Sequence, residues 1–255
     1  MDFAYPISGL IVGVIVGLTG VGGGSLMTPL LVLVFGIAPA TAVGTDLLYA
    51  AITKMGGAVA HGRRGNVDWK IVGLLAAGSV PASLLTTFGL HQLNVGAEHT
   101  AVIIKVTLGV ALILTAIALI FRTRIVDFSR TSGWLPAQRI APATVVVGLL
   151  LGAMVTISSV GAGAVGVAAL FFLYPNLRTT RIVGTDIAHA VPLTLVAGLG
   201  HASLGTVDYS LLGSLLIGSL PGIWIGSHLS SLMPERWLRG ALATMLVLVG
   251  GKLVF

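Results

Sequence analysis

Apolar residues fill most of this chain in stretches of about twenty, and short polar segments separate these stretches. A helix rises 1.5 Å per residue, so about 20 apolar residues cross the roughly 30 Å hydrocarbon core of a bilayer. Six stretches have this length and predict membrane-crossing helices. They are centred within Ala40 to Ala60, Lys70 to Leu90, Thr100 to Phe121, Arg181 to Gly200, Tyr209 to Leu229 and Leu238 to Phe255.

Two further apolar regions, residues 4–36 and 141–174, are too long for one ordinary crossing. Each is interrupted near its middle by a Gly-rich segment, residues 20–25 in the first and 158–163 in the second. The pieces on either side are mostly too short to cross alone. Each region therefore predicts a broken pair of helices that meet at a Gly-rich tip inside the membrane. Such a pair either returns to its own side as a hairpin or forms one broken crossing.

The second half of the chain repeats the first. Residues 43–46, Val-Gly-Thr-Asp, return as residues 183–186 at an offset of 140, and further upstream the offset is 139. Two copies of one unit in a membrane chain are typical of transporters whose substrate binds where the repeats meet. We therefore expect a single transport domain. Its parts are repeat 1 in residues 1–121, a cytoplasmic linker in residues 122–139 and repeat 2 in residues 140–255.

Basic residues distinguish the two possible topologies, because cytoplasmic loops carry an excess of Lys and Arg. If both broken pairs return, eleven basic residues near the ends of the stretches face the cytoplasm and one faces out. If each pair crosses once, the numbers are eight and four. The hairpins are favoured, and both termini are then outside. The predicted fold is an all-α polytopic membrane protein of two inverted repeats, each a broken helix pair followed by three transmembrane helices.

Composition agrees with a multi-pass protein of a cell membrane, of the bacterial inner-membrane type. With 56% hydrophobic and only 9% charged residues, the chain cannot cover a water-soluble globule. The net charge of +6 is scattered through short loops, which favours topology signalling over nucleic-acid binding. The absence of cysteine excludes disulfides and thiolate ligands, and no close His and carboxylate cluster predicts a metal site. We expect no cofactor.

The Gly-rich tips predict an anion site. Non-helical backbone at membrane depth is buried in protein or lines a cavity, because lipid cannot bond its amides. A tip that opens into a second half-helix directs free N–H groups and the positive helix end toward a ligand. The alternative is that the glycines only permit tight packing or a kink. The predicted substrate-binding residues are Gly22, Gly23, Gly24 and Ser25 in the first tip, and Ser158, Ser159, Gly161 and Gly163 in the second.

Asp46 and Asp186 lie several residues inside apolar stretches, where an ionised carboxylate is costly and usually functional. In a functional role they face each other across the pseudo-twofold axis, and at least one binds a proton that couples transport to the proton gradient. The alternative is that each is a helix N-cap, since Thr-Asp before an apolar residue is a helix start signal. Thr45 and Thr185, which precede the aspartates, are further predicted substrate-binding residues.

Lys54 is the candidate cation for an anionic substrate. It lies eight residues after Asp46, about two helical turns on and on the same face. The alternative is that its side chain extends toward the cytoplasmic end of the helix near His61. His189 lies one turn after Asp186, close enough for a hydrogen bond and a proton relay, or it is a buried core histidine.

Three motifs in fixed order carry a resemblance to a known family. They are Gly-Leu-Thr-Gly-Val-Gly-Gly-Gly-Ser at residues 17–25 followed by Pro29, Ala-Val-Gly-Thr-Asp at residues 42–46, and His61 followed by Gly-Asn-Val-Asp-Trp at residues 65–69. This pattern resembles the TauE/SafE family of sulfite and organosulfur exporters, over essentially the whole chain. Members of that family often carry Ser at the position of the aspartate in the second motif.

The resemblance implies a non-enzymatic transporter that exports a small anion, such as sulfite, an organosulfonate or another organic acid. A passive anion channel with the same site is one alternative. An intramembrane aspartyl protease is a weaker one, because both aspartates stand in the same Val-Gly-Thr-Asp context. The expected partners are a small anion, a coupling proton and the lipid bilayer, and no nucleic acid. The identity of the anion, the direction of transport and the oligomeric state stay open.

Overall fold

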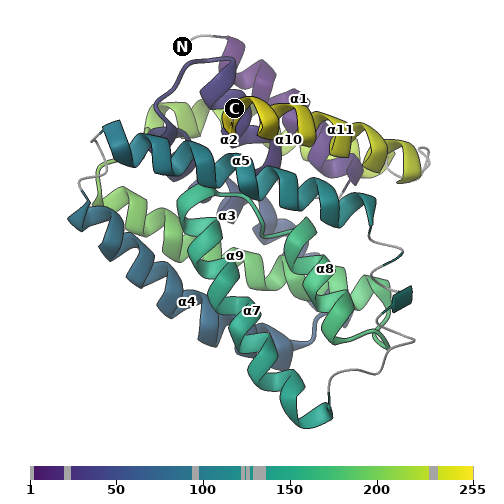
Figure 1. Ribbon diagram of the computed structural model, residues 1–255. Coiled ribbons are helices and arrows are strands. Elements are labelled where there is room, and N and C mark those ends of the chain that lie inside the picture. Colours follow the sequence, from purple (N-terminus) through teal and green to yellow (C-terminus); the bar gives the residue numbers. More distant parts are fainter. Residues whose placement is uncertain are drawn as a thin grey trace.

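The computed structural model describes residues 3–19, 24–93, 98–121, 124, 127–128, 136–229 and 235–254. Within these residues all regular structure is helical (Figure 1). The first half contains α1 (Ala4–Thr19), α2 (Gly24–Leu33), α3 (Pro39–Arg63), α4 (Trp69–Gln92) and α5 (Glu98–Ile120). The second half contains α7 (Ala137–Ser158), α8 (Ala164–Leu173), α9 (Thr179–Ser203), α10 (Tyr209–Leu229) and α11 (Glu235–Val254).

Five of these helices, α4, α5, α7, α9 and α10, are long and apolar enough to cross a membrane. Four of them coincide with predicted crossings. The fifth, α7, has 21 such residues, Gln138–Ser158, so the first arm of the second broken pair is as long as a full crossing and is an exception to the mostly short pieces that were predicted. Helix α3 has 25 residues, but Asp46 and Lys54 make it less apolar than these five. In α11 the apolar part is shorter, Leu242–Leu253.

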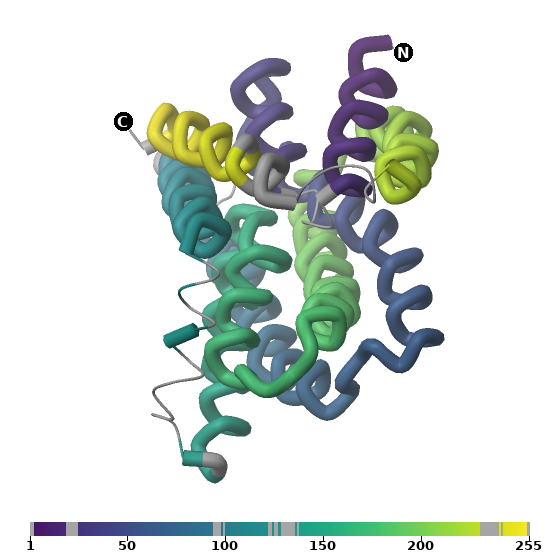
Figure 2. Tube along the Cα trace, turned by 90° about the vertical axis from the view of Figure 1, so that its right-hand side faces the viewer, coloured from purple at the N-terminus to yellow at the C-terminus, as the bar shows by residue number. Residues whose placement is uncertain are grey.

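Both broken pairs fold back on themselves. The ring of Tyr5, at the start of α1, lies 4.9 Å from that of Phe35, just after α2. At the equivalent positions of the second pair, the hydroxyl groups of Thr144 and Tyr174 are hydrogen bonded at 2.7 Å, which joins the start of α7 to the end of α8. The two pairs enter the molecule from opposite ends (Figures 1 and 2). This is the hairpin arrangement that the basic residues favoured.

Helices pack in reciprocal pairs across the two halves. Helix α1 packs on α10, and its counterpart α7 packs on α4, while α3 contacts α9 and α5 contacts α11. Glycines let the backbones approach: a Cβ at Gly13 would collide with the backbone of Ser219, and one at Gly152 with that of Ser79. These glycines therefore serve close helix packing. A two-fold relation between repeats produces such an exchange of partners. Which ends of the helices face the cytoplasm stays a prediction.

Helices α3 and α9 run antiparallel through the centre of the molecule. Gly198 packs against Leu48, whereas Gly57 packs against Ile187, so residue numbers rise along one helix as they fall along the other. The midpoint of this pair therefore lies close to Lys54. The largest cluster of buried apolar side chains draws on α1, α2, α3, α5, α10 and α11.

Candidate functional site

A cavity of about 460 Å³ lies between α1, α3, α5, α8, α9 and α10. Its lining includes Lys54 and Asp186, together with Gly163 and Ala164 at the start of α8. Apolar side chains form most of the remaining wall. The volume is in the range of sites that bind small organic ligands. The cavity therefore brings together a predicted tip, the predicted cation and one of the two predicted aspartates.

Lys54 reaches from repeat 1 into the tip of repeat 2. Its ammonium group donates a hydrogen bond of 2.8 Å to the carbonyl oxygen of Ala162. Because the ammonium group is bonded to this tip, the side chain does not extend toward the end of α3, which was the alternative expectation. The equivalent residue of repeat 2 is Thr194, whose hydroxyl donates to the carbonyl of Ala190 in its own helix at 2.8 Å. The two halves thus differ in charge at their shared centre.

The tip between α7 and α8 exposes a helix N-terminus to this cavity. Ser159, Gly161 and Gly163 have positive φ angles of 58°, 119° and 141°, which reverse the chain between the two helices. In the described chain the amides of Ala164 and Val165, the first two of α8, have no hydrogen-bond acceptor. Free amides and the positive end of a helix favour an anion.

The hydroxyl groups of the second tip differ in their availability. Ser158 donates to the carbonyl of Met154 at 2.7 Å, so its hydroxyl is held by its own helix. Ser159 has a buried hydroxyl that lies beside the carboxylate of Asp46. In the first tip, Gly22 and Gly23 lie outside the described residues. Gly24 begins α2, and Ser25 follows it with a buried side chain.

Asp46 and Asp186 are both fully buried in helix interiors. Helix α3 begins at Pro39 and α9 at Thr179, seven residues before each aspartate, so the N-cap alternative is wrong. Asp46 accepts a hydrogen bond from the hydroxyl of Thr28 in α2. Asp186 lines the cavity and packs on Gly166 of α8, and its Oδ1 atom has no hydrogen-bond partner in the described chain. Each aspartate therefore faces the second arm of its own broken pair.

The two aspartates do not face each other. Near Asp46, Gly44 packs against Thr206, whereas near Asp186, Gly184 packs against Asn66. Along the antiparallel pair these two levels are roughly 20 Å apart at 1.5 Å per residue. The expectation of two carboxylates meeting across the pseudo-twofold axis was wrong. An aspartyl protease needs two carboxylates close enough to share a proton, which this separation prevents.

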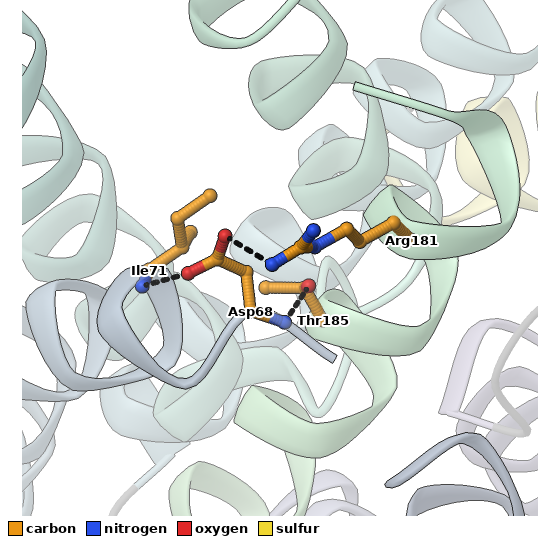
Figure 3. A network of polar contacts seen from close by, with 4 residues as sticks. All are labelled: Asp68, Ile71, Arg181 and Thr185. Carbon is orange, nitrogen blue, oxygen red and sulfur yellow. Dashed lines mark hydrogen bonds and ion pairs between the residues drawn. The ribbon is translucent and has the colours of Figure 1, made fainter. Parts of the chain in front are cut away.

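Thr45 and Thr185 bind backbone rather than the cavity. The amide of Asp208 donates to the hydroxyl oxygen of Thr45 at 3.0 Å, and the amide of Asp68 donates to that of Thr185 at 2.9 Å. Asp68 also caps α4 by accepting from the amide of Ile71 at 3.3 Å (Figure 3). These reciprocal bonds fasten the turns before α10 and α4 to the opposite repeat.

An ion pair reinforces only one of these two turns among the described residues. The guanidinium group of Arg181, at the start of α9, lies 3.1 Å from the carboxylate of Asp68 (Figure 3). At the other turn, Asp208 caps α10 by accepting from the amide of Leu211 at 2.9 Å. Because Arg181 is 45% exposed, this pair adds little stability on its own.

The histidines separate into structural and cavity groups. His189 is hydrogen bonded to the hydroxyl of Ser79 at 2.9 Å, so the structure pairs it with α4 rather than with Asp186. His201 is held by the hydroxyl of Thr206 at 2.9 Å, a structural role in the turn. His61 instead lines the cavity. In the described chain no three His, Asp or Glu side chains cluster closely enough to hold a metal ion.

Sequence reasoning missed Thr28 and the apolar wall of the cavity. Thr28 belongs to a short apolar helix and carries no motif, but its position three residues after the first Gly-rich segment could have suggested a contact with the aspartate. The wall includes Val167 and Ala168, which likewise lie a few residues after the second Gly-rich segment. No local pattern distinguishes such residues from lipid-facing ones.

Comparisons with known proteins agree along the whole chain. The family model "Sulfite exporter TauE/SafE" matches residues 5–253. "Probable membrane transporter protein YjnA" of Bacillus subtilis (strain 168) is 42% identical over 256 residues, which cover 100% of both chains. "Probable membrane transporter protein YdhB" of the same organism is 30% identical over 253 residues, 96% of this chain and 97% of the relative. No solved structure gives a significant match.

Proposed function

Because this chain belongs to the TauE/SafE family of membrane transporters, we propose that it exports a small anion together with a proton through the cavity at Lys54. The family accounts for a membrane transporter. We propose in addition that the substrate is an anion, that it moves outward and that a proton moves with it. Each of these three proposals rests on a separate feature of the cavity.

The hydrogen bond between Lys54 and the carbonyl of Ala162 carries the proposal of an anion. It holds an ammonium group beside the N-terminus of α8, whose first amides have no acceptor in the described chain. Positive charge and free N–H groups in a cavity attract a carboxylate, a sulfonate or a sulfite ion. A neutral or cationic solute gains nothing from these groups.

Asp186 supports the proton. Its carboxylate lines the same cavity as Lys54, so an ionised Asp186 offsets the lysine charge and repels an entering anion. Protonation removes that repulsion, and one proton then accompanies each anion. No other acidic side chain of the described residues lines the cavity. Asp46 is bonded to Thr28 and lies outside the cavity lining, so we assign the coupling to Asp186 rather than to both aspartates.

The direction in which the cavity extends from Lys54 supports export. From Lys54 the cavity extends to His61, Thr180 and Ser227, which lie near the ends of α3, α9 and α10. The predicted topology assigns these ends to the cytoplasm, because Arg63, Arg64 and Arg178 lie beside them. In this topology the cavity reaches toward the cytoplasm, the side from which an exporter must bind its substrate.

Flux into proteoliposomes tests this function. Purified protein is assayed with sulfite, sulfate, alkanesulfonates, carboxylates and quaternary ammonium ions, each with and without a pH gradient. We expect flux for at least one anion class, a large loss in Lys54→Gln, partial retention in Lys54→Arg and no loss in Lys70→Gln, whose lysine is exposed at the start of α4. Flux of ammonium ions alone would refute the proposal, and anion flux that ignores the pH gradient would indicate a passive channel.

A further inference from the structure

The wall of the cavity beyond Lys54 is apolar. Apolar side chains from four helices form it: Leu119, Val167, Ala168, Ile187 and Ile223. Thr53 also lines the cavity, but its hydroxyl donates to the carbonyl of Tyr49 at 2.8 Å and presents only its methyl group as a free surface. The middle of the cavity therefore offers a ligand contact area but almost no hydrogen bonds.

Polar groups gather at the two ends of this cavity. Lys54 and the tip of α8 lie at the inner end, and His61 and Ser227 lie in the last turns of α3 and α10. Lys54 is the one lysine or arginine among the described lining residues. A ligand at the inner end thus finds one positive charge and then an apolar passage.

A bare inorganic oxyanion is a poor match to this shape. The cavity of about 460 Å³ has the volume of about fifteen water molecules. An ion with three or four oxygens fills a small part of it and needs donors on all sides, because burying an unpaired charge is costly. The donors at Lys54 and the start of α8 reach one side only. An anionic head with an apolar body satisfies both regions.

Resting on the proposed anion function, we infer that the substrate is an organic monoanion, a carboxylate or sulfonate, whose apolar body lies against Val167, Ala168 and Ile187. The head group binds at Lys54 and at the N-terminus of α8. The body gains by leaving water, and each buried methylene strengthens binding about fourfold. Chain length, rather than the number of oxygens, then sets affinity until the cavity is full.

Calorimetric titration of the whole protein in lipid nanodiscs measures this directly. The probes are methanesulfonate, propanesulfonate and pentanesulfonate, with sulfate and pentyltrimethylammonium for comparison. We expect affinity to rise about fourfold per methylene along the sulfonates and sulfate to bind more weakly than pentanesulfonate. Equal or tighter binding of sulfate overturns this inference but leaves the anion function intact. Binding of the ammonium probe without any sulfonate overturns both.

Cavity-filling variants separate this site from general partition into lipid. Ala168→Phe occupies the wall and should remove the gain with chain length while methanesulfonate still binds. The matched control is Ala77→Phe, whose alanine is exposed on α4, and it should keep the full gain. If Ala168→Phe does not fold, Ile187→Ser should weaken pentanesulfonate binding several-fold and leave methanesulfonate unchanged. A gain that survives both wall variants overturns the inference.

Discussion

The ammonium group of Lys54 lies 2.8 Å from the carbonyl oxygen of Ala162, so a side chain of the first half holds the Gly-rich tip of the second half. The reverse contact has no equivalent cation, because the matching residue is Thr194. At this position only the first of the two repeats therefore contributes a positive charge. That asymmetry gives the cavity a preference for anions.

Asp186 and Asp46 should respond differently to removal of their charge. Asp186→Asn resembles the protonated carboxyl, so we expect anion binding to persist while acceleration by a pH gradient is lost. Asp46→Asn keeps an acceptor for Thr28 and should change flux much less. Flux measured in proteoliposomes across a range of pH values compares the two. A flat pH profile in Asp46→Asn together with a normal one in Asp186→Asn would reverse the assignment.

Close helix packing predicts that substitution by alanine changes the free energy of unfolding differently at two glycines of α4. A Cβ at Gly78 would collide with the backbone of Val145, so Gly78→Ala should lower the free energy of unfolding by about 1–3 kcal/mol. Gly73 has no atom within 4 Å of such a Cβ, so Gly73→Ala should be neutral or stabilise by up to about 1 kcal/mol. Thermal unfolding in detergent measures both. A more stable Gly78→Ala variant would contradict the packing between α4 and α7.

The turn before α4 allows a comparison of a partly buried hydrogen bond with an exposed ion pair. Thr185→Val leaves the amide of Asp68 without its acceptor and should cost about 1–3 kcal/mol. Arg181→Gln removes an exposed ion pair and should cost less than about 1 kcal/mol. The free energies of unfolding of the two single variants and of the double variant give the contribution of the hydrogen bond and that of the ion pair. A larger loss of stability in Arg181→Gln than in Thr185→Val would contradict this order.

Membrane topology can be read with single cysteines, since the chain contains none. Ser203 and Arg64 are exposed at opposite ends of the α3 and α9 pair. We expect Ser203→Cys to react with an impermeant thiol reagent on intact cells, and Arg64→Cys to react only after the membrane is opened. Labelling of Arg64→Cys on intact cells would invert the topology and with it the proposed direction of transport.

The sequence predicted the helical hairpins because they leave local marks. Gly-rich interruptions divide the apolar regions, and glycines at a spacing of four line the faces of α1 and α7 that approach α10 and α4. The chain reversals followed from Gly161 and Gly163, whose positive φ angles suit glycine. These features need no knowledge of distant contacts.

The roles of the polar residues were harder to predict because they depend on how helices cross. Thr45 and Thr185 bond to amides 163 and 117 residues away, a contact that only the antiparallel packing of α3 and α9 creates. Asp46 resembled a cap because Thr-Asp is a local start signal, yet Pro39 already begins the helix seven residues earlier. The bond from Lys54 to the opposite tip likewise has no signature in the sequence.

Acidification inside proteoliposomes tests the coupled transport of an anion most directly. A sulfonate remains ionised at neutral pH and cannot carry a proton by itself, so an inward gradient of the best-transported sulfonate should acidify the lumen only if the protein moves a proton with it. We expect acidification by the unaltered chain and by Lys70→Gln, and its loss in Lys54→Gln and Asp186→Asn. Acidification that persists in Lys54→Gln, or sulfonate uptake without any pH change, would contradict this expectation.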